Sequence, residues 1–211
     1  CVLQAGLGQG PARQAAIYAD IPYATGATTI NKLCGSGMKS VMLAHDLIQA
    51  GSANIVLAGG MESMSNAPYI LQKARQGYRL GHGELKDHMF CDGLEDVYTP
   101  GTLMGCFAEN TAKKYNLTRE QQDEFAILSM NRAIQSQQAN DFSDEIVPIT
   151  ITTKKSSHTV TTDEGTDPAK IAKVSRLKPA FAKDGTITPA STSSISDGAA
   201  SLLLMSATDA K

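Results

Sequence analysis

The sequence predicts an α/β fold, in which helices cover a sheet, and three observations lead to this prediction. Short apolar strands alternate with helices through the first third of the chain. Residues 55–58, Ile-Val-Leu-Ala, form a continuous apolar run that is typical of a parallel strand covered on both faces. The helix expected over 37–49 has only a narrow polar strip, which predicts burial at the centre of a domain. The resulting βαβαβ order favours a layered architecture.

The other elements of this first part follow from local signals. Strands are expected over 2–5 and 28–31. Proline is favoured at the first position of a helix, so Pro11 predicts a helix over 11–18. Gly51 ends the helix over 37–49, because glycine adopts the left-handed conformation that often follows a helix.

The pattern changes after the glycine pair at 59–60. Residues 66 to about 100 have weak periodicity, and two helices follow, over about 103–115 and 118–138. Thr118 and Gln121 have the spacing of a capping box. A strand is expected over 145–153, little signal over 154–175, and an apolar strand over 200–205. We interpret residues 66–190 as an insertion between two strands of one sheet, preceded by a core at 1–65 and followed by a return strand within 191–211.

Composition excludes several classes of function. The chain has 211 residues, 42% of them hydrophobic, with a net charge of -2, so we expect neither nucleic-acid binding nor a membrane span. Four unevenly spaced cysteines indicate a reducing compartment, and we expect a cytoplasmic protein, with an organelle as the alternative. The sequence begins and ends beside expected strands and has no signal peptide, so we expect a piece of a longer protein.

Cys34 is the strongest candidate for a chemical role. It lies in a strand-to-helix turn between Leu33 and Gly35, and a long helix is expected directly after it. A thiol at the start of a helix lies near the positive end of the helix dipole, which favours the thiolate. Such a thiolate is a suitable nucleophile for acyl transfer. The alternative is a buried cysteine that packs as a small hydrophobic side chain.

Other candidates have simpler explanations. His82, His88 and Cys91 match no common zinc spacing, so we expect solvated loop residues and no metal site. His45 lies in the middle of an expected helix, which favours a structural, hydrogen-bonded histidine. The glycines at 6, 8 and 10 do not have the spacing of a dinucleotide site, because Pro11 stands where the third glycine is needed.

Several motifs together resemble one known family. Residues 31–37, Asn-Lys-Leu-Cys-Gly-Ser-Gly, and residues 58–65, Ala-Gly-Gly-Met-Glu-Ser-Met-Ser, resemble the thiolase family and are most similar to its acetyl-CoA acetyltransferases. Further segments match in the same order: 8–15, Met104-Gly105, 108–110, 178–181, and Ser193 with 197–200. Several long motifs in the correct order are far more specific than one short pattern.

The resemblance implies a layered αβα thiolase fold with a mixed sheet. The inserted residues 66–190 would form an α+β loop domain that binds coenzyme A, and the C-terminal thiolase domain would lie outside this sequence. Cys34 would be the catalytic nucleophile, and its backbone N–H would contribute to an oxyanion site. Met104 and Phe181 would line the path of the pantetheine, and Ser193 would hydrogen-bond a pantetheine amide.

The resemblance also implies the reaction and the partners. Two molecules of acetyl-CoA would condense to acetoacetyl-CoA and CoA, or the reverse, through an acyl-cysteine intermediate. Coenzyme A is then substrate and product, no other cofactor is needed, and the chain would assemble as a dimer or tetramer. Three alternatives stay open: a degradative 3-ketoacyl-CoA thiolase of broader chain length, a related ketoacyl synthase that uses an acyl-carrier protein, and a non-catalytic truncated thiolase.

The chain departs from the family pattern in two ways. The family supplies its acid/base groups from motifs of the C-terminal half, Gly-His-Pro, Asn-Glu-Ala-Phe and Cys-x-Gly, which do not occur here in their proper context. We therefore expect this piece alone to be inactive. In addition, Leu103 replaces a histidine beside the pantetheine, and Thr166 and Asp167 stand where an arginine is usual.

Overall fold

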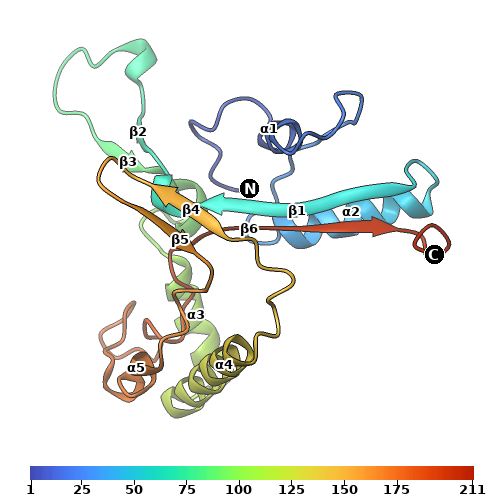
Figure 1. Ribbon diagram of the computed structural model, residues 1–211. Coiled ribbons are helices and arrows are strands. Elements are labelled where there is room, and N and C mark those ends of the chain that lie inside the picture. Colours follow the sequence, from blue (N-terminus) through green and yellow to red (C-terminus); the bar gives the residue numbers. More distant parts are fainter. The chain divides into compact units, whose positions relative to one another are not determined.

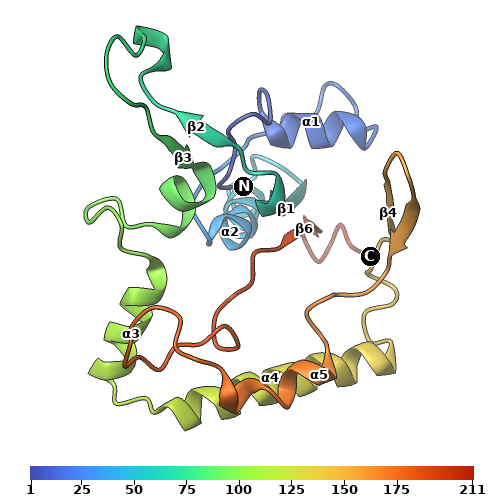
Figure 2. The same ribbon diagram turned by 90° about the vertical axis from the view of Figure 1, so that its left-hand side faces the viewer.

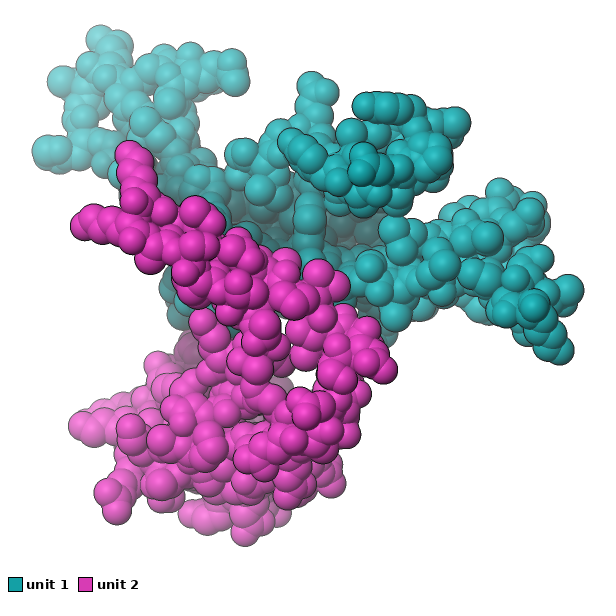
Figure 3. Space-filling view, in the orientation of Figure 1, with its two compact units in different colours: residues 1–103, 195–211 teal, residues 104–194 magenta.

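The computed structural model describes residues 1–211 and contains two compact units. Unit 1 comprises residues 1–103 and 195–211, and unit 2 comprises residues 104–194 (Figure 3). Each unit is described below by itself. The boundaries expected from the sequence, at 65/66 and 190/191, differ from these units and stay a prediction.

Unit 1 is built on a pair of long strands and one helix. Strand β1 (Ile55–Ser63) pairs antiparallel with β6 (Asp197–Met205) along its whole length, and α2 (Ser36–Gln49) packs against the pair (Figure 1). Glycine permits the close pairing of the two strands, because a Cβ atom on Gly59 would collide with the Ala200 carbonyl oxygen.

Shorter elements complete unit 1. They are α1 (Pro11–Tyr18), the antiparallel pair β2 (Tyr69–Leu71) and β3 (Leu85–Asp87), 3-10 turns at Met64–Asn66 and Ala74–Gln76, and a π-helical turn at Phe90–Leu94. The β2–β3 pair and its connecting loop project from the rest of the unit as a hairpin (Figure 2).

Unit 2 contains two substantial helices and a hairpin. Its elements are α3 (Met104–Lys114), α4 (Arg119–Ala139), the hairpin of β4 (Ile149–Thr152) and β5 (Ser157–Val160), the short helix α5 (Pro168–Ile171) and a 3-10 turn at Val174–Arg176. Helix α5 lies along α4 (Figure 2).

The capping box predicted for α4 is confirmed. The Thr118 hydroxyl accepts the Gln121 N–H at 3.2 Å, and the Gln121 side-chain oxygen accepts the Thr118 N–H at 2.9 Å. Helix α1 has the predicted bounds, and α2, α3 and α4 begin and end within a residue or two of prediction. Gly51 has the expected left-handed conformation, with φ of 70°.

Two predicted strands are absent, over residues 2–5 and 28–31. A strand needs a neighbour whose backbone groups pair with its own, and no strand lies beside either segment. A side chain accepts the N–H groups of Val2 and Leu3 instead, since both donate to the Glu62 carboxylate, at 2.8 and 2.9 Å.

The parallel arrangement expected for residues 55–58 is also wrong in this chain, because the only neighbour of β1 is the antiparallel β6. The sequence further failed to predict β5 and α5, which lie in the stretch over 154–175 that showed little signal. Strand β5 is polar, and its threonine and serine side chains pair with those of β4 rather than fill a core.

The predicted burial of α2 is wrong as well. Ala44 is buried, but Met38 is 75% exposed and Met42 and Leu47 are exposed too. The helix packs on β1 and β6 along one side, and these apolar residues remain exposed elsewhere on its surface. None of the helices combines the length and the apolar character that crossing a bilayer requires.

Candidate functional site

Cys34 lies in a tight turn directly before α2, as predicted, and its side chain is exposed. The preceding residue, Leu33, has a φ of 51°, in the left-handed region that residues other than glycine rarely adopt. The Asn31 side-chain oxygen accepts the Leu33 N–H at 2.9 Å, which stabilises this conformation. Asparagine commonly stabilises a turn in this way. The alternative of a buried, packed Cys34 is therefore wrong in this structure.

Ser36 fixes the shape of the turn from inside. It is only 5% exposed, its hydroxyl accepts the Lys32 N–H at 2.9 Å, and it donates to the Leu33 carbonyl at 2.6 Å. The Gly35 N–H also donates to the Lys32 carbonyl, at 3.1 Å. These bonds hold the backbone on both sides of Cys34 and so fix the point from which its side chain projects.

Backbone N–H groups are available around Cys34. Those of Cys34, Gly37 and Met38 donate to no protein acceptor, and no side chain caps the start of α2. Unpaired N–H groups at a helix start carry the positive end of the dipole, and they stabilise a thiolate or an oxyanion. The exposed sulfur and the unpaired N–H groups are two features that favour a nucleophilic cysteine.

The other three cysteines are less accessible than Cys34. Burial raises the pKa of the Cys91 thiol, and the nearby Asp92 carboxylate raises it further. Cys1 donates its thiol hydrogen to Glu62 at 3.5 Å. A raised pKa keeps Cys91 in the thiol form, which is a weak nucleophile.

The expectation that His88 is a solvated loop residue is wrong. Its ring is buried, its Nε2 accepts the Ala5 N–H at 3.3 Å, and its Nδ1 lies 2.7 Å from Asp92 Oδ2 in an ion-pair contact that lacks the alignment of a hydrogen bond. His88 is therefore a buried residue that stabilises the start of the chain, through its hydrogen bond with Ala5. No three His, Cys, Asp or Glu side chains lie close enough together to hold a metal ion.

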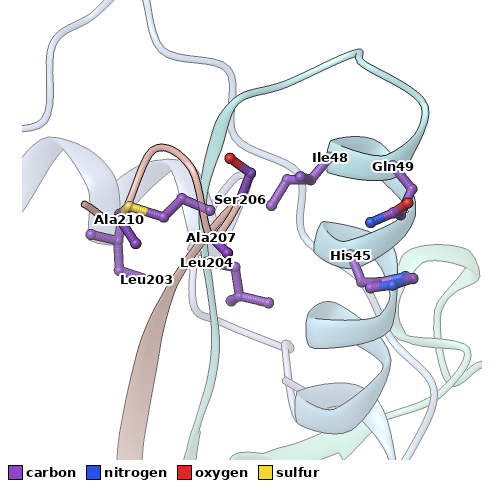
Figure 4. Close-up of a pocket in the computed structure, with 9 residues that line it drawn as sticks. His45, Ile48, Gln49, Leu203, Leu204, Ser206, Ala207 and Ala210 are labelled. Carbon is purple, nitrogen blue, oxygen red and sulfur yellow. The ribbon is translucent and has the colours of Figure 1, made fainter.

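A hollow of about 540 Å³ in unit 1 lies at the far end of α2 from Cys34. His45, Ile48 and Gln49 line it from the last turns of the helix, and the end of β6 and the following turn line the other side (Figure 4). His45 is exposed, and its Nδ1 forms the predicted hydrogen bond, with Asp46 Oδ1 of the neighbouring residue at 3.2 Å.

In unit 2, the structure brings together two of the residues expected to bind coenzyme A. Met104 begins α3 and is 45% exposed. The ring of Phe181 covers the next residue, Gly105, so closely that a Cβ atom there would collide with it. Ser193 is exposed beyond a turn at 188–192, and no hydrogen bond links it to Met104 or Phe181.

The model of the family described as "Thiolase, N-terminal domain" matches residues 1–208. The chain belongs to the thiolase family. It is 52% identical over its whole length to acetyl-CoA acetyltransferase of Cupriavidus necator, of which it covers 54%. This thiolase chain therefore spans about half the length of the curated relatives that it matches.

Solved thiolase structures confirm the fold class. Acetyl-CoA acetyltransferase from Syntrophomonas wolfei matches 99% of this chain with a TM-score of 0.90 and 38% identity, and the chain covers 52% of it. The Acat5 thiolase from Ascaris suum, solved in complex with coenzyme A, has a TM-score of 0.87 and 41% identity over 98% of this chain, which covers 52% of it. The separate α+β loop domain stays a prediction.

Sequence analysis missed several residues that shape the candidate site and the start of the chain. The burial of Ser36 and the conformation of Leu33 depend on contacts within the turn, which no periodicity reveals. Glu62 belongs to a motif that carried the resemblance, but its role as acceptor for the first residues was not foreseen. A motif thus marks a residue without saying what it contacts.

Proposed function

We propose that Cys34 is the acyl-accepting nucleophile of an acetyl-CoA acetyltransferase of the thiolase type. The observation that supports this most directly is the exposed sulfur of Cys34 in a fixed turn whose neighbouring N–H groups are unpaired. The curated relative that is 52% identical to the chain has the name of this activity.

The proposed reaction has two steps. The Cys34 thiolate attacks the carbonyl carbon of acetyl-CoA, the bond from that carbon to the CoA sulfur breaks, and the proton from Cys34 ends on the departing CoA. A second acetyl-CoA then loses an α-proton, and its carbanion attacks the acetyl group on Cys34. The bond from the acetyl carbon to the Cys34 sulfur breaks, acetoacetyl-CoA leaves, and the thiolate of Cys34 takes up a proton in place of the α-proton that was removed.

Residues of this chain would perform part of the reaction, and residues outside these 211 would perform the rest. Its unpaired N–H groups at the start of α2 are placed to stabilise charge on the oxygen of the attacked carbonyl. Proton transfer needs an acid/base group, and by the family resemblance it comes from segments outside these 211 residues. The whole protein would therefore condense two acetyl-CoA molecules or cleave acetoacetyl-CoA.

We propose that unit 2 binds coenzyme A. Met104 and Phe181 would contact the pantetheine, since both present apolar surface at the start of α3, and Ser193 would hydrogen-bond an amide. The Ascaris suum relative was solved in complex with coenzyme A, which supports a coenzyme A site in this fold. A homodimer or tetramer in a reducing compartment such as the cytoplasm completes the proposal.

The test is acetylation of the 211-residue chain by acetyl-CoA, followed by acid quenching and peptide mass spectrometry. We expect an acetyl adduct on Cys34, no adduct in the Cys34→Ser variant, and an unchanged adduct in the Cys91→Ser variant. An equal distribution over the four cysteines would disprove the assignment of the nucleophile. Coenzyme A binding without any adduct would favour the non-catalytic alternative.

A further inference from the structure

We infer that Glu109 is a positioning residue that holds the proposed coenzyme A contacts of unit 2 in place. The inference rests on the proposed function, because it concerns Phe181 and Ser193 as contacts of the pantetheine. Glu109 lies on α3, in the second turn of the helix.

The Glu109 carboxylate binds two consecutive backbone N–H groups. Its two oxygens accept the Thr186 N–H at 3.0 and 2.9 Å, and Oε1 also accepts the Ile187 N–H at 2.9 Å. The Thr186 hydroxyl donates to Oε2 at 3.3 Å. Hydrogen bonds to an ionised acceptor are stronger than neutral ones.

These bonds provide acceptors for N–H groups in residues 185–188, which form no regular secondary structure. The segment belongs to no helix or strand, yet Ile187 and Thr188 are buried. Buried backbone N–H groups need an acceptor, and here a side chain on α3 provides it. The carboxylate thus fastens an irregular segment to a helix.

On one side of the fastened segment lies Phe181. The Ala180 N–H donates to the Ile187 carbonyl at 2.9 Å, which closes a loop that contains Phe181. The ring of Phe181 covers Gly105, which lies four residues before Glu109. Residues four apart share a helix face, so the same face of α3 holds both the ring and the loop.

On the other side lies Ser193. Thr188 is fully buried, and its carbonyl accepts the Ser191 N–H at 3.0 Å and the Thr192 hydroxyl at 3.2 Å. This turn begins one residue after the bond from Ile187 to Glu109. The position of Ser193 therefore depends on the segment that Glu109 holds.

Gly185 shows how closely the carboxylate approaches the loop. A Cβ atom at this position would collide with Glu109 Oε1. Gly185→Ala therefore offers a way to displace the carboxylate without removing it, and it complements Glu109→Gln. In the glutamine variant, an NH2 group would face N–H donors in place of one carboxylate oxygen.

Two measurements on the 211-residue chain test the positioning role. Hydrogen exchange of the Thr186 and Ile187 amides reports whether their hydrogen bonds to Glu109 are intact. Titration with coenzyme A reports how the loss of these bonds changes the affinity. We expect both variants to lose protection at these amides. We also expect them to bind coenzyme A about tenfold more weakly, the order of effect for a lost charged acceptor.

A third measurement separates positioning from a general loss of structure. The rate of Cys34 acetylation is compared for acetyl-CoA and for S-ethyl thioacetate, which lacks the pantetheine. We expect both variants to be slower only with acetyl-CoA at concentrations below saturation. Glu124→Gln, an exposed glutamate on α4, and Gly26→Ala, a glycine with open space around it, are matched controls that should leave all three measurements unchanged.

The outcomes distinguish the two proposals. The positioning role of Glu109 is overturned, and the proposed function stands, if the original chain and both variants bind coenzyme A equally tightly. The same conclusion follows if acetylation of Cys34 slows equally with acetyl-CoA and with S-ethyl thioacetate. If the original chain neither binds coenzyme A nor becomes acetylated on Cys34, the proposed function fails, and the inference fails with it.

Discussion

The surroundings of the cysteines differ in how strongly they favour or disfavour the thiolate form. Burial and Asp92 raise the pKa of Cys91, so its thiolate forms only at higher pH, whereas Cys34 is exposed beside unpaired N–H groups. We expect iodoacetamide near neutral pH to alkylate Cys34 well before Cys91, as measured by peptide mapping over time. Asp92→Asn removes one of the causes that raise the pKa, and should speed labelling of Cys91. Equal rates at both cysteines would contradict this account.

Ser36 illustrates the cost of losing one buried hydroxyl. Ser36→Ala leaves the Lys32 N–H without its acceptor, so we expect the free energy of unfolding to fall by about 1–3 kcal/mol. Urea denaturation measures the change. Ser52→Ala, at an exposed position whose hydroxyl makes no hydrogen bond, is the control and should have little effect. A loss as small as that of the control would show that the turn does not depend on Ser36.

At the scale of elements, the start of α4 depends on its capping box. Thr118→Ala removes the hydroxyl that accepts the Gln121 N–H, and we expect a loss of about 1 kcal/mol in the free energy of unfolding. Urea denaturation followed by circular dichroism measures it. Thr161→Ala, in an exposed stretch, should leave the midpoint unchanged. A helix that tolerated both changes equally would argue against the cap.

The start of β6 should respond to acid. Hydrogen bonds from the Ser65 hydroxyl and N–H lower the pKa of Asp197. A lowered pKa in the folded chain means that this contact stabilises the fold above the usual carboxyl range, and that the contribution is lost as pH falls through the lowered value. We expect the Ser65 amide to lose exchange protection on acidification. The change should be absent in Asp197→Ala, in which the Ser65 N–H has lost its acceptor and should be poorly protected at every pH.

The sequence predicted helices better than strands, for a physical reason. Helix α1 and the cap of α4 depend on local signals, Pro11 and the pair Thr118–Gln121, which are legible in one segment. Strands depend on a neighbour far along the chain. The sequence placed the strands on either side of residues 66–190 in one sheet, but the antiparallel direction and register of β1 with β6 could not be derived from either strand alone. The site divides in the same way. The turn at Cys34 was predictable, but the bonds of Ser36 and Glu109 were not, because they depend on how distant or irregular segments meet.

At the scale of the whole molecule, we expect one acetylation of Cys34 by acetyl-CoA but no repeated catalytic turnover. The acid/base motifs of the family do not occur in their proper context in these 211 residues, so we expect acetylation of Cys34 but no sustained thiolysis of acetoacetyl-CoA. The release of acetyl-CoA over many cycles is the measurement, with a complete thiolase as the positive control. Turnover near that of the control would show that this chain contains its own acid/base group.

The uncovered side of α2 has a chemical consequence of its own. Met38 and Met42 are both exposed, and a thioether in contact with water is readily converted by peroxide to a sulfoxide. Each oxidation places a polar oxygen on the exposed apolar surface of α2, the helix that follows the turn at Cys34. Dilute peroxide followed by mass mapping would show whether these two sulfur atoms react before the half-buried methionines, and so whether the stripe is as open in solution as its geometry implies.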